Sequence, residues 1–467
     1  MHISNIRLGF ANNSSSSHSL IFLPNENLKD EGVENAEFGW GQFVCASKDA
    51  KNLYLAVMLQ YQIQLPEKIK YLVIRELTGI DLLEYEDGYK SPYVDHQSIF
   101  AIPMSFEGEI PDEEFLKELQ DYVSREGVVI AGGNDNGGES NLLSEGSIID
   151  LGLPSEAYGL ICRKDRKYGY WTLFHRSTGA KIRMILGGKV SPEKAEFPEL
   201  VDLKITDFCH HNCPFCYQGS TPQGEHADHN DISAALSHLS DIKVFEVAIG
   251  GGEPTYHPKF VSILEEASRL GIVPNFSTRS LDWLRDPKKW VPIIDVIGSF
   301  AYSVQSSKDV QELATLMKYN GIRQSKVSIQ YVMGSTSIWE FRTIVEEVSK
   351  SDFNLTLLGY KTPGDGRSFN KNETTNWIKI VKENYDRDSY YTPITIDTAL
   401  AKEYEELLKM NQVPKITYHT QEGKFSMYVD AVEGKIGPSS YCDKNEMIDF
   451  SFRGTSSEII AQAFAKW

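Results

Sequence analysis

The chain has 467 residues, too many for one ordinary compact domain, so we expect two or three folded units. Apolar residues make up 41% and charged residues 24%, and the formal net charge of -18 argues against a surface that grips nucleic acid through its phosphates. No apolar run approaches about 18 residues, and the first ten residues lack the apolar stretch of an export signal. We therefore expect no membrane-spanning helix, and a cytoplasmic protein.

Residues 1–197 are expected to form an N-terminal α+β domain whose role the sequence does not indicate. Short apolar segments in this region predict buried strands at residues 71–74, 128–131, 158–162 and 168–174, the last two as a hairpin. The polar tract 12–18 is typical of a loop or a flexible arm. The glycine-rich segment 132–138 lacks the spacing of a phosphate-binding loop, so we expect a tight turn there.

Residues 198–369 alternate between short apolar segments and amphipathic segments. The apolar segments predict strands at residues 201–206, 245–250, 273–278, 297–304, 326–333 and 355–361. Helices are expected between them at residues 232–239, 260–270, 310–319 and 339–349. Such alternation indicates parallel βαβ units, and right-handed crossovers curl six of them into an α/β fold with a partial (β/α)6 TIM-like barrel. Ligands are then expected at the carboxyl ends of the strands.

Residues 370–467 are expected to form a small C-terminal extension. Its sequence predicts helices at residues 377–384 and 398–410 and a hairpin at 425–436. Cys442 follows this hairpin.

Three of the six cysteines lie within eight residues, directly after the first expected strand of the core: Cys209, Cys213 and Cys216. Such a cluster in a long chain with few cysteines indicates a metal site in a reducing compartment. Three thiolates can hold three irons of a cubane cluster and leave the fourth iron open, as catalysis requires. The alternative is a zinc site with a fourth ligand from His210, His211 or Cys442.

The spacing Cys-x3-Cys-x2-Cys, with Phe215 just before the last cysteine, resembles the signature of the radical S-adenosylmethionine (SAM) superfamily. The next expected strand leads into Gly251-Gly252-Glu253-Pro254, which resembles the family's GGEP segment. Glycines there allow a close approach to a ligand, and Glu253 offers a carboxylate to an ammonium group. The resemblance covers residues 198 to about 365. It implies a [4Fe–4S] cluster that cleaves SAM to methionine and a 5′-deoxyadenosyl radical, with the GGEP segment receiving the methionine amino group.

Polar residues at the later strand ends extend the expected SAM site. Ser277 ends the third strand before Thr278 and Arg279, where relatives often have Thr-Asn-Gly, so the role of Arg279 stays open. Ser303 matches the family position that commonly contacts the SAM ribose or carboxylate, and Gln330 lies near the place where adenine is usually held. For each of these residues the alternative is packing at a strand end.

The C-terminal extension resembles those of peptide-modifying relatives, which often carry several cysteines for auxiliary clusters. Cys442 stands alone there, so we expect no full auxiliary cluster. It is a candidate hydrogen-atom donor to a substrate radical, as in peptide epimerases that resemble this family. The alternative is a buried cysteine that packs as a small apolar residue.

The resemblance and the large N-terminal region together predict a radical SAM enzyme that abstracts hydrogen from a peptide or a protein. Its expected partners are that substrate and an electron donor such as a flavodoxin or a ferredoxin. One alternative is a radical SAM enzyme that acts on a small metabolite or a nucleotide. Another is a non-catalytic, metal-bound interaction protein.

Overall fold

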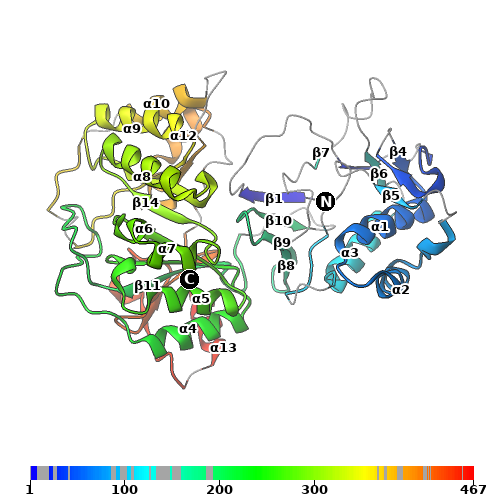
Figure 1. Ribbon diagram of the computed structural model, residues 1–467, viewed down its shortest axis with the longest axis horizontal. Coiled ribbons are helices and arrows are strands. Elements are labelled where there is room, and N and C mark those ends of the chain that lie inside the picture. The colour runs from blue at the N-terminus through cyan, green and yellow to red at the C-terminus, as the bar shows by residue number, and fades with distance from the viewer. Residues whose placement is uncertain are drawn as a thin grey trace. The chain divides into compact units, whose positions relative to one another are not determined.

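The chain divides into two compact units, Met1–Pro192 and Glu193–Trp467 (Figure 1). This computed structural model describes residues 2–7, 20–24, 29–39, 43–85, 91–94, 102–106, 110–125, 128–132, 148–149, 159–185, 193–364, 368–372, 376–385, 393–413, 418, 420, 422–454 and 456–467. The tract 12–18 and most of the glycine-rich segment 132–138 lie outside these residues.

The first unit combines small sheets with helices. Its main sheets have the orders β1-β10-β9-β8 and β4-β6-β2-β7. Their strands are β1 (His2–Arg7), β2 (Leu20–Pro24), β4 (Phe43–Cys45), β6 (Val128–Gly132), β7 (Ile148–Ile149), β8 (Leu160–Asp165), β9 (Tyr170–His175) and β10 (Lys181–Ile185). The helices include α1 (Lys48–Gln62), α2 (Glu67–Thr78) and α3 (Glu113–Val123), and β3 (Glu37–Phe38) pairs with β5 (Tyr93–Val94).

The sequence expectations for this unit are partly confirmed. The strand at 128–131 is β6, and the expected hairpin is the antiparallel pair β8–β9. The strand expected at 71–74 is wrong, because these residues lie within α2. Tyr71, Ile74 and Leu77 recur at helical spacing and pack on the core. A run of four apolar residues is too short to distinguish the helical repeat from the alternation of a strand.

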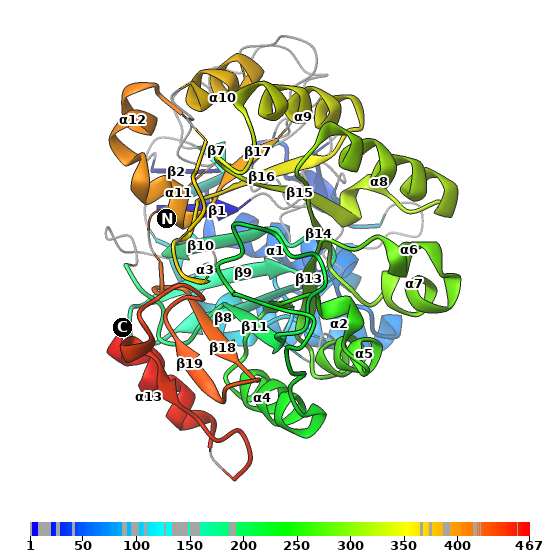
Figure 2. The same ribbon diagram turned by 90° about the vertical axis from the view of Figure 1, so that its left-hand side faces the viewer.

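A ten-stranded sheet organises the second unit, in the order β17-β16-β15-β14-β13-β12-β11-β18-β19-β20. The six expected strands are confirmed as β11 (Leu200–Thr206), β12 (Glu246–Gly251), β13 (Val273–Thr278), β14 (Phe300–Ser303), β15 (Val327–Val332) and β16 (Asn354–Leu358), all parallel. The four expected helices are α4 (His229–Asp241), α5 (Phe260–Arg269), α8 (Ser307–Asn320) and α9 (Ile338–Lys350). Figure 2 shows them along one side of the curved sheet. This arrangement is the partial TIM-like barrel.

Further elements extend this core. Two short helices, α6 (Asp282–Arg285) and α7 (Pro287–Ile294), precede β14, and α10 (Trp377–Tyr385) and β17 (Ile394–Ile396) follow β16. The helix expected at 398–410 is two helices, α11 (Thr398–Glu403) and α12 (Glu405–Met410), because Tyr404 leaves the helical conformation. The expected C-terminal hairpin is β18 (Ser426–Asp430) with β19 (Lys435–Gly437), and β20 (Ile448–Asp449) and α13 (Ser457–Lys466) follow.

The two faces of the sheet differ in polarity. On the face toward the helices, Phe276 of β13 packs against Phe260 of α5 with ring centroids 5.1 Å apart, and Tyr331 of β15 stacks on Phe341 of α9. The strand register places the opposite residues on the inner face, where every one of the following stays partly exposed: Asp202, Ala248, Gly250, Asn275, Ser277, Ala301, Ser303, Ser328, Gln330 and Thr356. The barrel interior therefore presents small and polar side chains that remain accessible.

A buried ion pair joins the C-terminal strand β18 to β11. Lys204 Nζ lies 2.9 Å from Asp430 Oδ2 and 2.7 Å from Asp207 Oδ1. Lys204 is 5% exposed and Asp430 is 4% exposed. The other oxygen of Asp430 accepts hydrogen bonds from the backbone N–H groups of Val432 and Glu433, so the same carboxylate also shapes the turn after β18.

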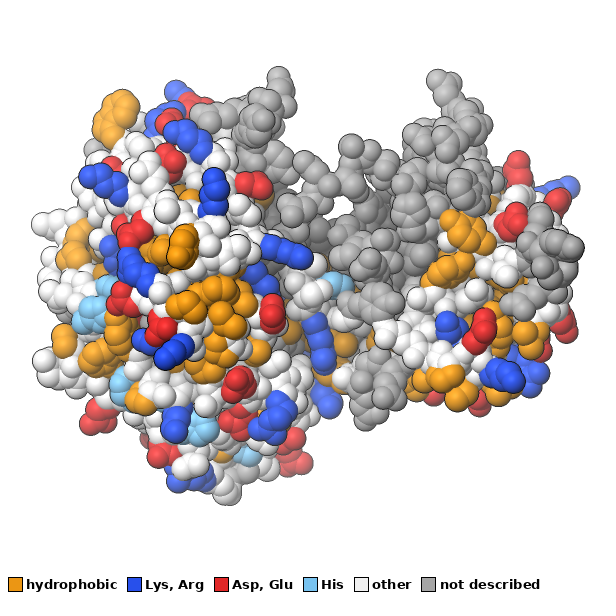
Figure 3. All heavy atoms as spheres, in the orientation of Figure 1, with side chains coloured by type: hydrophobic (Ala, Val, Ile, Leu, Met, Phe, Trp, Pro, Cys, Tyr) orange, Lys and Arg blue, Asp and Glu red, His pale blue; other side chains and the backbone are white. Residues whose placement is uncertain are grey.

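The described surface shows mixed charge. On the face shown in Figure 3, acidic and basic side chains of the second unit are interspersed rather than gathered by sign. None of the helices in the described part of the chain is both long and apolar enough to cross a membrane.

Candidate active site

The loop after β11 carries the three clustered cysteines: Cys209, Cys213 and Cys216. Backbone hydrogen bonds shape this loop, because Cys209 N donates to Thr221 O at 2.9 Å and Cys216 N donates to Cys213 O at 3.0 Å. All three thiols are free and half-buried. Phe215 packs edge-on against Phe369, with ring centroids 5.7 Å apart. The loop thus presents three available thiols at the carboxyl edge of the parallel strands.

Gly251 and Gly252 bring the end of β12 directly onto the start of the cysteine loop. Gly252 N donates to Thr206 O at 2.7 Å, and Glu253 N donates to Phe208 O at 2.7 Å. A Cβ at Gly251, whose φ is +116°, would lie 2.2 Å from Thr206 O, and one at Gly252 would lie 2.2 Å from Phe208 O. These glycines therefore let two segments of this chain approach each other, a packing role that the sequence did not indicate.

Substituting Gly252 by alanine should disturb the cysteine loop, because the new Cβ collides with the rigid backbone at Phe208. We expect a loss of about 1–3 kcal/mol in unfolding free energy and a lower iron content after reconstitution. Gly250→Ala is the matched control, since a Cβ at Gly250 meets nothing within 4 Å. Iron analysis and thermal denaturation of both variants test this; equal behaviour would contradict it.

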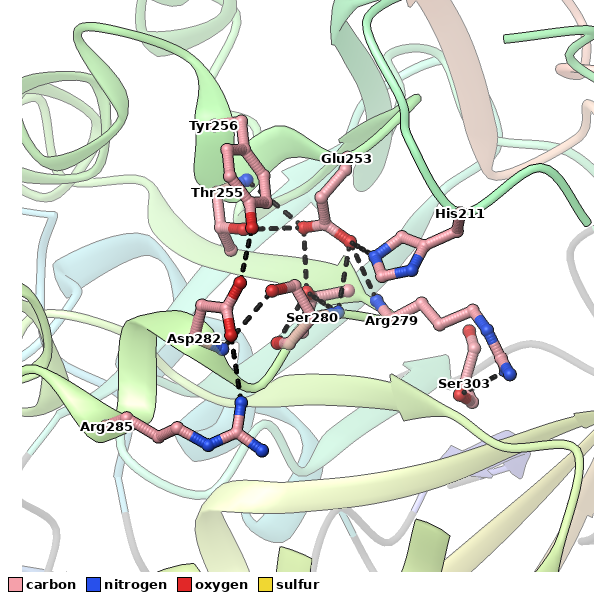
Figure 4. Close-up of polar contacts among 10 residues, drawn as sticks. His211, Glu253, Thr255, Tyr256, Arg279, Ser280, Asp282, Arg285 and Ser303 are labelled. Carbon is pink, nitrogen blue, oxygen red and sulfur yellow. Dashed lines mark hydrogen bonds and ion pairs between the residues drawn. The ribbon is translucent and has the colours of Figure 1, made fainter. Parts of the chain in front are cut away.

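Glu253 ties the end of β12 to the end of β13 (Figure 4). Its Oε1 accepts hydrogen bonds at 2.7 Å from the hydroxyls of Thr255 and Thr278. Its Oε2 accepts from the backbone N–H groups of Arg279 at 2.9 Å and Ser280 at 3.2 Å. The side chain is 1% exposed. Donors of the chain itself thus occupy most of the acceptor capacity of this carboxylate and fix its orientation.

Arg279 links the ends of β13 and β14. Its Nη1 donates to Ser303 O at 3.1 Å (Figure 4), and its Nη2 donates to Gln305 Oε1 at 3.0 Å. Burial raises the pKa of the Cys213 thiol, and the positive charge of Arg279 opposes this rise. The residue whose role the sequence left open therefore spans two strand ends and places a fixed cation near the cysteine loop.

The residues proposed for zinc do not converge. The His211 Nε2 atom lies 3.5 Å from Glu253 Oε2, and the ring of His210 packs edge-on against Tyr256 at 4.7 Å. Within the described ranges, no three His, Cys, Asp or Glu side chains lie close enough together to share one metal ion. A single zinc ion needs four such ligands at one point, whereas a cubane binds each thiolate at a different iron. The donor set of three free thiols fits the cubane better.

The other expected SAM-binding residues lie on or beside the inner face. Ser303 and Gln330 are register partners on β14 and β15, so the structure brings them side by side. Ser277 lies on the neighbouring strand β13, opposite Ala301. Pro254 is buried directly after the glycines. Contact of these residues with SAM stays a prediction.

Cys442 lies in the segment that follows the C-terminal hairpin. Its thiol is half-buried and packs toward β19, since a Cβ at Gly437 would lie 3.2 Å from the Cys442 Sγ. Burial raises the pKa of this thiol. Two residues earlier, the Ser440 hydroxyl lies 3.0 Å from the Tyr217 hydroxyl, next to the last clustered cysteine. The segment thus touches the cysteine loop, while the thiol itself lies against the hairpin.

Comparison with known proteins identifies the central domain. Residues 203–332 match the family described as the Radical SAM superfamily. The PqqA peptide cyclase of Bradyrhizobium diazoefficiens is 33% identical over 89 residues, which are 18% of this chain and 23% of that protein. The chain thus matches about a quarter of that relative's length.

Solved structures to which part of this chain is similar include SuiB of Streptococcus suis bound to the precursor peptide SuiA. It is 16% identical, with a TM-score of 0.46, over 57% of this chain and 65% of SuiB. Another is anSMEcpe with bound AdoMet and the Kp18Cys peptide, at 14% identity and a TM-score of 0.42, over 56% of this chain and 80% of that one.

Proposed function

Because residues 203–332 form a radical SAM domain, we propose that this chain is a radical SAM enzyme that abstracts hydrogen from a peptide or a protein. The observation that carries the proposal is the family match, which spans the cysteine loop, the glycine segment and the ends of β11 to β15. In the structure, three free thiols, the Glu253 network and Arg279 lie at the edge of the sheet to which these strands lead.

Cys209, Cys213 and Cys216 would hold a [4Fe–4S] cluster through their thiolates. SAM would bind beside it, near Glu253, Ser277, Ser303, Gln330 and Phe215. The bound cluster would supply the electron that cleaves SAM to a 5′-deoxyadenosyl radical.

The chain itself contributes positioning and shielding. Five hydrogen bonds hold the Glu253 carboxylate in one orientation, so that an ammonium group would meet a carboxylate of fixed position. The helices cover the outer face of the sheet, so a reactive species on the inner face is separated from solvent on that side.

A peptide or protein substrate is supported by two observations. The curated relative named above is a peptide cyclase, although only 89 residues align. The segment after the C-terminal hairpin reaches the cysteine loop through a hydrogen bond between Ser440 and Tyr217, as an element that limits or contacts a substrate near the cluster would. We further propose a cytoplasmic location, where thiols stay reduced, and a flavodoxin or a ferredoxin as the electron donor.

The test is anaerobic reconstitution with iron and sulfide, followed by reduction with dithionite. We expect a [4Fe–4S] signal in electron paramagnetic resonance and formation of 5′-deoxyadenosine from SAM. A mixture of candidate peptides should increase that yield more than free nucleotides or small metabolites do. Absence of the cluster signal and of SAM cleavage would overturn the proposal and favour a non-catalytic metal-bound protein. Stimulation by nucleotides alone would overturn only the choice of substrate.

Cys442 is proposed as the hydrogen-atom donor in this reaction. Cys442→Ala should keep the cluster and SAM cleavage, because its thiol lies against β19 and not in the cysteine loop. Once a peptide product is known, Cys442→Ala should form much less of it than the wild type does. In deuterated solvent, the wild type alone should transfer deuterium from the thiol to the product. Unchanged product and unchanged deuterium content would remove this role.

A further inference from the structure

Asp202 lies in the middle of β11, on the inner face of the sheet. Its register partners are Ala248 on β12 and Tyr428 on β18. Ala248 and Gly250 are both small and partly exposed, and a Cβ added at Gly250 would meet no atom within 4 Å. The Asp202 side chain is itself partly exposed. It therefore lies next to open space over β12.

The Asp202 carboxylate has no hydrogen-bond donor within the ranges that the structure describes. No hydrogen bond or ion pair reaches it from any residue in the described part of the chain. Burial raises the pKa of Asp202 to about 6, although the Lys361 ammonium opposes the rise. At neutral pH the group is therefore mostly ionised. An ionised carboxylate within a protein is costly unless a partner compensates it.

Lys361 does not supply that partner, because two aromatic rings hold its ammonium group. Its Nζ lies 4.8 Å from the ring centroid of Tyr217 and 4.7 Å from that of Tyr441. Among the described residues, carboxylates act on this ammonium through their charge alone, without a hydrogen bond to it. Cation–π contacts of this kind stabilise a desolvated ammonium, so the Lys361 ammonium is already partly compensated without an ion pair to Asp202.

Negative charge dominates around this ammonium. The charges of Asp202, Asp397 and Glu422 all act on Lys361. Asp397 Oδ1 already accepts from the backbone N–H groups of Gly359 and Leu400, at 2.8 Å each. Glu422 Oε2 already accepts from the Tyr441 hydroxyl at 3.0 Å, and burial raises the pKa of Glu422. Three carboxylates thus act on one ammonium, and among the described residues Asp202 is the one of the three that accepts no hydrogen bond at either oxygen.

We propose that Asp202 binds a cationic group of the substrate, an amine or a guanidinium such as a lysine or arginine side chain of a peptide. This inference rests on the proposed function, since it assigns the substrate class of the same barrel. Lys361, whose charge acts on Asp202, contacts Tyr217, which directly follows Cys216. A cation placed there satisfies the free carboxylate and offsets the excess of negative charge.

The test uses two probes whose backbone ends are capped and therefore uncharged. They are Nα-acetyl-lysine methylamide and its norleucine counterpart, which lacks only the side-chain amine. Titration calorimetry on the full-length protein should show binding of the lysine probe about tenfold or more tighter than that of the norleucine probe. Asp202→Asn should abolish this difference. Asp449→Asn, the same substitution at an exposed position on β20, should preserve it.

Each outcome separates this site from the proposed function. Equal binding of both probes to the wild type, no measurable lysine binding, or a preference that survives Asp202→Asn overturns the site. Thermal denaturation should show Asp202→Asn unfolding no earlier than the wild type, since removal of a partly buried charge that has no partner does not destabilise the fold. SAM cleavage by the wild type without probe is measured in parallel. Its absence would overturn the radical SAM activity, whereas its presence with equal probe binding overturns Asp202 alone.

Discussion

Replacing Cys213 by alanine should abolish SAM cleavage, to below about one thousandth of the wild-type rate. The three thiols of the loop are all free, and each would bind a different iron. Loss of one thiol would leave the cluster with two protein ligands, expose a second iron and weaken the binding of the whole cluster. Iron and sulfide content after reconstitution should therefore fall together with 5′-deoxyadenosine formation. The same result is expected at Cys209 and Cys216.

Cys442→Ala is the matched control for this experiment. Its thiol lies against β19, so the iron content should remain that of the wild type. The control also separates the two metals, because a zinc site with Cys442 as fourth ligand would lose its metal in this variant. Retained SAM cleavage in Cys213→Ala would contradict the cluster assignment, as would zinc in place of iron in the wild type.

Lys204→Met should lower the unfolding free energy of the second unit by about 3–5 kcal/mol. The substitution leaves Asp430, which is 4% exposed, without the ammonium group that lies 2.9 Å away. Asp207 loses the same partner. Methionine fills a similar volume, so the loss measures the uncompensated charge rather than a cavity.

Hydrogen exchange followed by mass spectrometry suits this test, because it reports on the two units separately. Peptides from β11 and β18 should exchange faster in Lys204→Met, whereas peptides from the first unit should not change. Lys379→Met, at a side chain that is 74% exposed, is the control and should shift stability by less than about 0.5 kcal/mol. Equal protection of β11 in both variants would show that the ion pair contributes nothing.

The barrel strands were predictable because their signal is local. Short apolar segments between amphipathic segments indicate parallel strands, whatever the order of those strands in the sheet. The cysteine loop is then expected at the carboxyl end of the first strand. Pairing between distant segments has no such signal. The sequence shows that residues 425–436 form a hairpin, but not that β18 lies beside β11, more than 200 residues earlier.

The site was predictable only where a motif marked it. The glycines of the GGEP segment were expected beside a ligand, yet their contacts are with the backbone of Thr206 and Phe208. Arg279 has its partners on the following strand end, which no spacing shows. For Asp202 a signal existed, because Asp202 and Lys204 place two charges at alternate positions of an otherwise apolar strand. That pattern indicates one polar face within a barrel.

The pairing of β18 with β11 has a consequence for biosynthesis. Ribosomes deliver the chain from the N-terminus, at about 5–20 residues per second. The cysteine loop therefore emerges while one edge of β11 still lacks its neighbour, and Lys204 still lacks Asp430. A nascent chain that stops before residue 426 has the three thiols but an open strand edge beside them. We expect such truncated chains to aggregate or to be degraded before they acquire iron, so that cluster insertion is a late, largely post-translational step.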